Sequence, residues 1–217
     1  LIMKKSILLF ASFLLIALSC KNEETEAIST NEEGKAQEAS HVYSPVKHPE
    51  WSSNSSIYEV NIRQFTEEGT FTAFSKHLPR LQKLGVEILW IMPIQPIGEE
   101  KRKGGLGSYY SIKDYKAVNP EFGSIEEFKN LVKQAHEMGF KIILDWVANH
   151  SAWDNVWMNE NPEWYSTDSM GNIVAPVADW SDVADLNYES KEMRAAMLEA
   201  MEFWVKETDI DGYRCDV

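Results

Sequence analysis

The order of apolar patterns along residues 56–217 is the feature that most constrains the fold. Short apolar runs, which indicate buried strands, alternate with longer segments in which apolar residues recur at helical spacing. The predicted strands are 56–62, 86–92, 140–147 and 210–217, and the predicted helices are 71–84, 125–138 and 190–204. A strand–helix–strand order without hairpins requires a parallel sheet with right-handed crossover connections.

Two α/β architectures contain such a sheet: an open doubly wound sheet and a closed TIM (β/α)8 barrel. A nucleotide-binding sheet would carry a glycine-rich phosphate loop after its first strand, and no such loop follows residue 62. A barrel needs eight strands and about 250 residues. We therefore expect a TIM barrel of which this chain holds only about the first half, with four β-strands.

Local signals place the ends of two predicted helices. Ser124 and Glu127 form a capping box at the start of the helix at 125–138, and Gly139 follows its end. Pro79 lies inside the helix at 71–84, which predicts a kink or a later start there.

The first fifty residues are typical of a targeting segment and a linker. Lys4 and Lys5 precede an apolar run of about twelve residues, short of the ~20 needed to cross a bilayer, which favours a signal peptide at 1–20 over a buried core helix. The run ends in a bacterial lipobox-like sequence, so Cys20 would carry a lipid anchor, the only membrane attachment expected. Residues 21–50 are rich in Glu and predict a flexible acidic tether. The acidic residues after Cys20 resemble a surface-export signal, which implies a secreted lipoprotein displayed at the outer membrane.

The net charge and the aromatic content limit the kinds of molecule that the chain is expected to bind. The chain has 34 acidic and 21 basic residues, a net charge of −13, which would repel the phosphate backbone of a nucleic acid. We therefore expect no nucleic-acid partner. Eight Trp, eight Tyr and nine Phe fit either a large aromatic core or a cleft for an amphipathic ligand such as a sugar.

Ionisable residues gather where two of the predicted strands end. One strand ends in Asp145, followed by Asn149 and His150, and the last ends in Arg214 and Asp216. Barrel enzymes keep their active sites at the carboxyl ends of the strands. The pattern therefore predicts a site there, in which the Arg214 guanidinium favours the charged form of Asp216. We expect Asp145 to order the strand end and Cys215 to pack in the core.

These residues resemble the signatures of the α-amylase family (glycoside hydrolase family 13). The spacing Asp145-x-x-x-Asn149-His150 and the spacing Gly212-x-Arg214-x-Asp216 are similar to its first and second signature regions. Supporting matches are 89–94, 110–115 and 185–187, and the resemblance covers residues 51–217.

The resemblance implies a role for each matching residue. Asp216 is the expected nucleophile, with Arg214 holding it ionised and oriented by a planar, two-pronged contact. His150 would hydrogen-bond the sugar and Tyr110, rather than its neighbour Tyr109, would stack against it. Asn149 and Asp185 match two positions that are Ca²⁺ ligands in many family members, although some relatives carry no metal there. The resemblance therefore implies a possible Ca²⁺ site at these two residues. The implied substrate is an α-glucan, either starch or a maltooligosaccharide.

A retaining glycosidase needs a second carboxyl group about 5 Å from the nucleophile, and the family takes it from the fifth strand. We expect that residue to lie beyond Val217, which makes the chain an N-terminal part that is inactive alone. The segment at about 151–187 is expected to be a short insertion whose aromatic residues shape subsites or pack onto the barrel. Neopullulanase, cyclomaltodextrinase and oligo-1,6-glucosidase activities fit the same motifs. The alternative from another class is a non-catalytic glycan-binding or structural barrel.

Overall fold

The computed structural model describes residues 47–217. The predicted signal peptide, Cys20 and all but the last four residues of the predicted tether lie outside the described residues. No helix within residues 47–217 has both the length and the apolar character needed to span a membrane.

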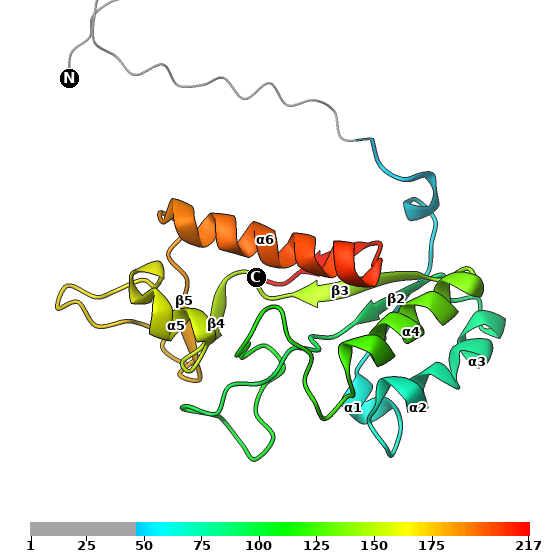
Figure 1. Cartoon of the computed structure of the whole chain (residues 1–217), viewed down its shortest axis with the longest axis horizontal. Coiled ribbons are helices and arrows are strands. Elements are labelled where there is room, and N and C mark those ends of the chain that lie inside the picture. Colours follow the sequence, from blue (N-terminus) through cyan, green and yellow to red (C-terminus); the bar gives the residue numbers. More distant parts are fainter. Residues whose placement is uncertain (1–46) are drawn as a thin grey trace, which may run out of the picture. The chain divides into compact units, whose positions relative to one another are not determined.

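A four-stranded parallel sheet forms the centre of the described part (Figure 1). Its strands are β1 (Ile57–Val60), β2 (Ile88–Ile91), β3 (Lys141–Trp146) and β6 (Gly212–Cys215), in the order β1-β2-β3-β6. All three pairings are parallel, beginning with Ile57 opposite Ile88, Ile88 opposite Lys141, and Ile143 opposite Gly212. The prediction of four parallel strands in a partial barrel is confirmed.

Helices connect these strands and begin where the sequence signals predict. The helices are η1 (Glu50–Ser52), α1 (Ile62–Phe65), α2 (Phe71–Ser75), α3 (Leu78–Lys83), α4 (Ile125–Glu137) and α6 (Lys191–Thr208). The capping box at Ser124 is present, with Glu127 bonded back to the Ser124 backbone, and Gly139 adopts a φ of 89° just after α4. The predicted helix at 71–84 is two helices, because Pro79 lies in the first turn of α3, where a missing N–H costs nothing.

The insertion after β3 is a small subdomain with regular structure. It contains β4 (His150–Ala152), α5 (Val156–Glu160), η2 (Pro162–Trp164) and β5 (Val183–Asp185). β4 and β5 pair antiparallel, with His150 opposite Asp185. Figure 1 shows this group beyond the arrowhead of β3, at the carboxyl end of the sheet.

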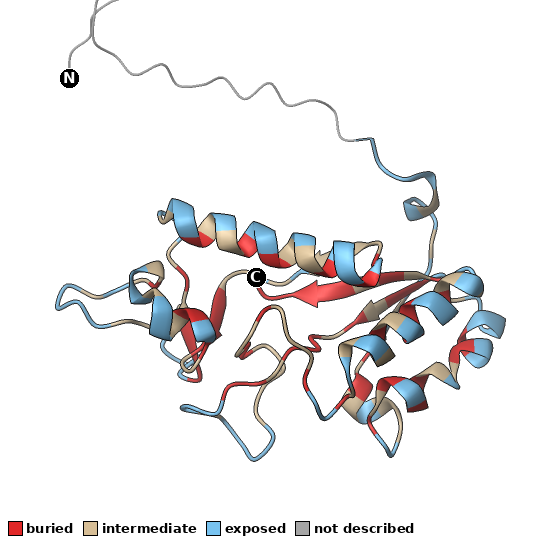
Figure 2. Ribbon diagram, viewed as in Figure 1, coloured by how far each residue is buried: buried red, intermediate tan, exposed pale blue. Residues whose placement is uncertain are grey.

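The two faces of the sheet differ in burial. One face packs against the helices, and Leu89, Leu144 and Trp204 there are at most 1% exposed. Figure 2 shows α6 buried along the side that faces the sheet. On the other face, Glu59, Trp90 and Ile143 lie side by side in register and keep exposed surface. The prediction that 86–92 is buried on both faces holds at Ile88, Leu89 and Ile91, which are at most 5% exposed, and Trp90 on the second face is half-buried.

Candidate active site

The pairing of β3 with β6 brings together the two sequence motifs. Asp145 lies opposite Arg214 in the register. Just past the strand, the backbone N–H of Asp216 donates to the carbonyl of Trp146 at 2.8 Å. Asp216 is thus fixed at the carboxyl end of the sheet, next to Arg214.

Arg214 links two carboxylates. Its Nη1 donates to Asp145 Oδ1 at 3.0 Å and to Asp216 Oδ1 at 2.5 Å. The expected two-pronged contact between Arg214 and Asp216 is absent from the described residues. Instead, Nη1 of Arg214 alone contacts the carboxylates of both Asp145 and Asp216. The guanidinium carbon lies 4.7 Å from the centre of the Trp90 ring, a distance at which an aromatic face attracts a cation.

Asp145 is the most buried member of this group. Its side chain has no exposed surface, and it also accepts a hydrogen bond from the Tyr110 hydroxyl at 3.0 Å. Burial raises the pKa of the Asp145 carboxyl, and the hydrogen bonds from Arg214 and Tyr110 offset only part of this effect. Burial and the adjacent Asp145 carboxylate also raise the pKa of Tyr110. Tyr110 therefore remains a neutral hydroxyl, and Asp145 positions both Tyr110 and Arg214.

His150 begins β4 and reaches the same site from the insertion. It is buried, and burial lowers the pKa of its ring below the usual value, which favours the neutral imidazole. Nδ1 of His150 lies 3.2 Å from the side-chain nitrogen of Asn149. Because that amide nitrogen can only donate, this contact favours the tautomer in which Nδ1 accepts and Nε2 carries the ring proton. In that tautomer His150 can donate a hydrogen bond from Nε2.

A cavity of about 240 Å³ lies at this site. It is lined by Ser108, Tyr110, His150, Trp180, Asp182, Val183 and Asp216. Three residues singled out in the sequence, Asp216, His150 and Tyr110, thus share one cavity. Tyr109 does not line it, and its ring instead lies 4.4 Å from the guanidinium of Arg63.

A larger cavity, of about 520 Å³, lies elsewhere, between the segment that follows β2 and the start of α5. Arg63, Arg102 and Lys113 line it together with Glu99, Asp114 and Glu121, and no predicted site residue does. We place the candidate active site in the smaller cavity because the nucleophile candidate and its ionic partner meet there.

Asn149 directly precedes β4, and Asp185 is the last residue of β5. Asp185 is opposite His150, and the Asn149 carbonyl accepts a hydrogen bond from the N–H of Leu186 at 3.2 Å. Their side-chain oxygens are of the hard type that Ca²⁺ prefers, but Ca²⁺ takes six to eight such ligands. Among residues 47–217 no group of three or more His, Cys, Asp or Glu side chains could hold a metal.

Two residues near the site are not among the site residues predicted from the sequence, although Trp90 lies within the supporting match at 89–94. Trp90 sits inside a predicted strand, and Asp182 lies in the insertion; only the pairing of β2 with β3 and the folding of the insertion bring them near Arg214 and His150. The expectation that Cys215 packs in the core is wrong for this chain, because its side chain is exposed. It follows Arg214 on β6, so its side chain points to the opposite face of the strand.

Comparisons with known proteins agree with this geometry. The model of the family described as Alpha amylase, catalytic domain, matches residues 28–173 and 175–217. Alpha-amylase 3 of Dictyoglomus thermophilum is 31% identical over 196 residues, which cover 76% of this chain and 37% of that protein. Trehalose synthase of Pimelobacter sp. is 29% identical over 205 residues, which cover 77% of this chain and 35% of that protein.

A solved structure shows the same similarity in three dimensions. The crystal structure of an alpha-amylase from Lactobacillus plantarum matches with a TM-score of 0.72 and 45% identity, covering 75% of this chain and 38% of that chain. The chain thus spans less than two fifths of the length of these relatives. The match of the family model over most of the chain shows that the chain belongs to the α-amylase catalytic domain family, glycoside hydrolase family 13.

Proposed function

We propose that the protein is a retaining glycoside hydrolase that cleaves starch or maltooligosaccharides, with Asp216 as its nucleophile. The observation that carries this proposal is the position of Asp216. It lines a cavity together with Tyr110 and His150, and Arg214 donates to its carboxylate at 2.5 Å. A carboxylate held by a cation at the wall of a cavity is suited to attack an electron-poor carbon.

In this mechanism an oxygen of Asp216 bonds to the anomeric carbon while the glycosidic C–O bond breaks. The leaving oxygen takes a proton from a second carboxyl group, and water later releases the sugar from Asp216 with retention of configuration. His150 donates from Nε2 to a sugar hydroxyl, and the Tyr110 ring faces the sugar. Asp182, the other acidic residue of this cavity, pairs with Lys103 at 3.1 Å, and we do not assign it the acid role. By family resemblance we expect the acid on the strand that would follow β6.

The anomeric configuration of the product tests this proposal. The complete protein is incubated with maltotetraose, and proton NMR follows the first product formed before mutarotation. We expect the α-anomer first. An initial β-anomer would contradict a nucleophilic role for Asp216. Purified residues 41–217 are expected to be inactive on starch, because half a barrel leaves the sheet edges open and supplies no acid.

The alternative function is binding of glycans without catalysis. A binding protein has no need of an ionised carboxylate held at the wall of its cavity, yet Arg214 and Asp216 are both present and in contact. This contact favours the enzyme. Among enzymes, neopullulanase, cyclomaltodextrinase and oligo-1,6-glucosidase activities remain alternatives, and assays with pullulan, cyclodextrin and isomaltose would distinguish them.

We also propose that Asn149 and Asp185 help to bind one Ca²⁺ ion that ties the insertion to the sheet. The support for this is that Asn149 directly precedes β4, Asp185 ends β5, and the Asn149 carbonyl accepts from the N–H of Leu186 at 3.2 Å. The ion would act on structure, by joining the two ends of the insertion.

We propose, from the lipobox-like sequence, that Cys20 is lipidated and anchors the protein to a membrane. Cys20→Ala should release the protein from the membrane fraction or leave it unprocessed. A wild-type protein that is soluble and cleaved at another site would contradict the anchor. Protease treatment of whole cells separately tests display at the cell surface.

A further inference from the structure

The insertion contains five aromatic residues, and the structure separates them by environment. Trp157 and Tyr165 are buried in the core, and Trp164 packs edge-on against Trp157 at 5.6 Å. Trp153 lies under the Nζ of Lys101 and donates from its indole N–H to the Ser181 carbonyl. Trp180 differs from these four because it is 38% exposed and lines the cavity that contains Asp216.

The turn that carries Trp180 is held by side chains from other segments. The carbonyl of Asp179 accepts from Lys103, that of Ser181 from Trp153 at 3.0 Å, and that of Asp182 from Ser111 at 3.1 Å. The carboxylate of Asp182 also forms an ion pair with Lys103 at 3.1 Å. A turn fixed at three carbonyls loses little conformational freedom when a ligand binds. Trp180 is therefore an exposed aromatic ring on a rigid support.

The surroundings of Trp180 fit a sugar ligand. Its ring lies edge-on to that of His150, with 5.5 Å between centroids, and Tyr110 lines the same cavity. Asp182 adds a carboxylate whose side chain is 11% exposed. An aromatic face and a carboxylate together match the two sides of a sugar, its apolar C–H face and its hydroxyl groups.

We propose that Trp180 and Asp182 are specificity-determining residues, which bind the glucosyl unit held in the cavity of Asp216. Trp180 stacks against the C–H face of the sugar, and Asp182 accepts hydrogen bonds from its hydroxyls while Lys103 holds the carboxylate in place. The insertion thus contributes Trp180 and Asp182 to the sugar site together with His150, and the segment after β2 and the residue after β6 contribute Tyr110 and Asp216. This inference rests on the proposed function, because it concerns the same cavity.

The test measures binding separately from turnover. All variants are made in the complete protein carrying Asp216→Asn, and maltotetraose binding is measured by calorimetry. We expect Trp180→Ala to weaken binding roughly tenfold or more, since a stacked ring is lost, and Trp180→Phe to weaken it less. Asp182→Asn should weaken binding more than Lys103→Met, because it replaces one of the two acceptor oxygens by a donor and removes the negative charge, whereas Lys103→Met leaves the carboxylate intact.

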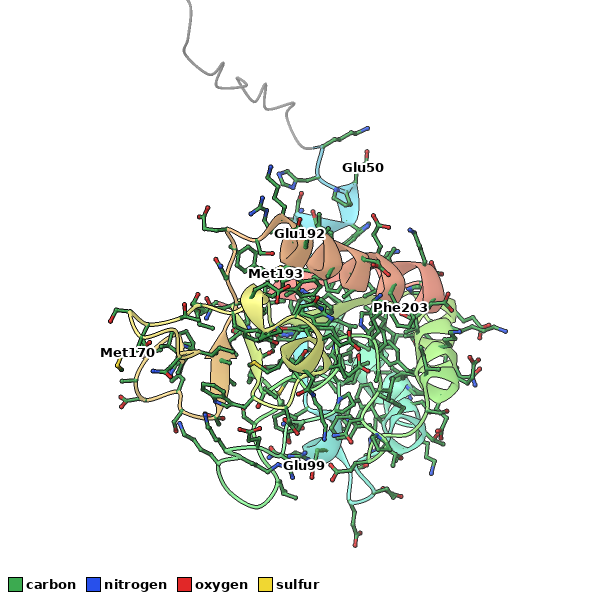
Figure 3. The ribbon with its side chains drawn as sticks, turned by 60° about the vertical axis from the view of Figure 1, so that its left-hand side comes forward. Glu50, Glu99, Met170, Glu192, Met193 and Phe203 are labelled. Atoms are coloured by element: carbon green, nitrogen blue, oxygen red, sulfur yellow. The ribbon has the colours of Figure 1, made fainter. Side chains whose placement is uncertain are left out.

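A matched control comes from the same insertion. Met170 is 81% exposed and lies at the outer tip of the insertion in Figure 3. Met170→Ala should bind maltotetraose as the parent does. In the background with Asp216 intact, Trp180→Phe should raise KM more than it lowers kcat, a split that general destabilisation of the fold would not produce.

The two kinds of failure are distinguishable. If the Asp216→Asn parent binds maltotetraose and the two Trp180 variants bind it equally well, the inference is wrong and the proposed function stands. If the parent does not bind maltotetraose at all, the proposed function is wrong, and the inference falls with it.

Discussion

The same pair of strands, β3 and β6, carries a cluster of charged residues at each end. At the carboxyl ends, Arg214 joins Asp145 and Asp216 beside the cavity. At the amino ends, the Asp211 carboxylate accepts from Lys141 Nζ, from the backbone N–H of Ile142 and from His136 Nε2, each at 2.8 Å. The clusters use similar residues, and Asp216 of the first cluster lines the cavity of the candidate active site.

The carboxylates of buried Asp145 and half-buried Asp211 respond differently to their surroundings. Burial raises the pKa of Asp145, and its hydrogen bonds do not compensate. Burial acts on Asp211 in the same direction, but the hydrogen bonds from Lys141, Ile142 and His136 outweigh it and lower its pKa overall. The ionised Asp211 therefore stabilises the fold, whereas the ionised Asp145 costs stability. This matches a barrel whose carboxyl end serves chemistry and whose amino end serves stability.

The sharpest test of this contrast replaces one carboxylate at the carboxyl end. In the complete protein, Asp216→Asn should lower kcat roughly a thousandfold or more, because the attacking charge is lost. Arg214→Lys should also be severe, because a lysine cannot place a planar group over Trp90 while reaching both carboxylates. Turnover is measured on maltotetraose and stability by urea unfolding. An Asp216→Asn variant with more than a few per cent of wild-type turnover would contradict a catalytic role for the cluster at the carboxyl ends of β3 and β6.

The reciprocal test acts on the amino end. Asp211→Ala should lower the free energy of unfolding by about 1–3 kcal/mol, because three donors lose a charged acceptor. Turnover at a permissive temperature should not change. Lys141→Met, which removes one of those donors, is the matched control and should destabilise less. If Asp211→Ala lowered kcat with little loss of stability, the division of labour between the two ends would be wrong.

The pH dependence of stability sharpens the same contrast. The folded-state pKa of Asp211 is lowered, so its contribution is present above the unfolded value of about 3.9 and is lost as pH falls through the folded value. The folded-state pKa of Asp145 is raised, so its contribution is present below about 3.9 and is lost as pH rises through the folded value. At pH 7, Asp211→Asn should therefore melt below the wild type, and Asp145→Asn should melt at or above it.

Melting curves between pH 3 and pH 7, each variant against the wild type, provide the measurement. Both differences should shrink toward the acid end of the range. A lower melting temperature for Asp145→Asn than for the wild type at pH 7 would show that the ionised Asp145 carboxylate stabilises the fold, contrary to this expectation.

The smallest expected effect concerns calcium at the carboxyl end. Chelation of the complete protein should lower its melting temperature by a few degrees, since an ion that binds only the folded state stabilises it. Asn149→Ala combined with Asp185→Ala should abolish the response to chelation. An unchanged melting temperature, with no metal found by elemental analysis, would reject the site.

The sequence predicts the strands, the helix ends and the motif residues because these depend on local patterns. The capping box at Ser124 follows from residues three positions apart, and Asp145 and Asp216 are visible as polar ends of apolar runs. The stacking of Trp90 on Arg214 depends on strand order, and the Asp211 cluster depends on where the end of α4 meets β6. Such contacts join distant segments, so no local spacing reveals them.

The pairing pattern of the sheet also bears on how it assembles. The segment of chain between two paired strands becomes longer along the sheet. The shortest segment, with α1, α2 and α3, joins β1 to β2, and a longer one with α4 joins β2 to β3. The longest, which contains the insertion and α6, joins β3 to β6. Closing a longer loop costs more entropy, and distant pairings form more slowly. Among these four strands we therefore expect β1 and β2 to pair first and β6 to pair last, so Arg214 and Asp216 reach Asp145 only after β1, β2 and β3 have paired.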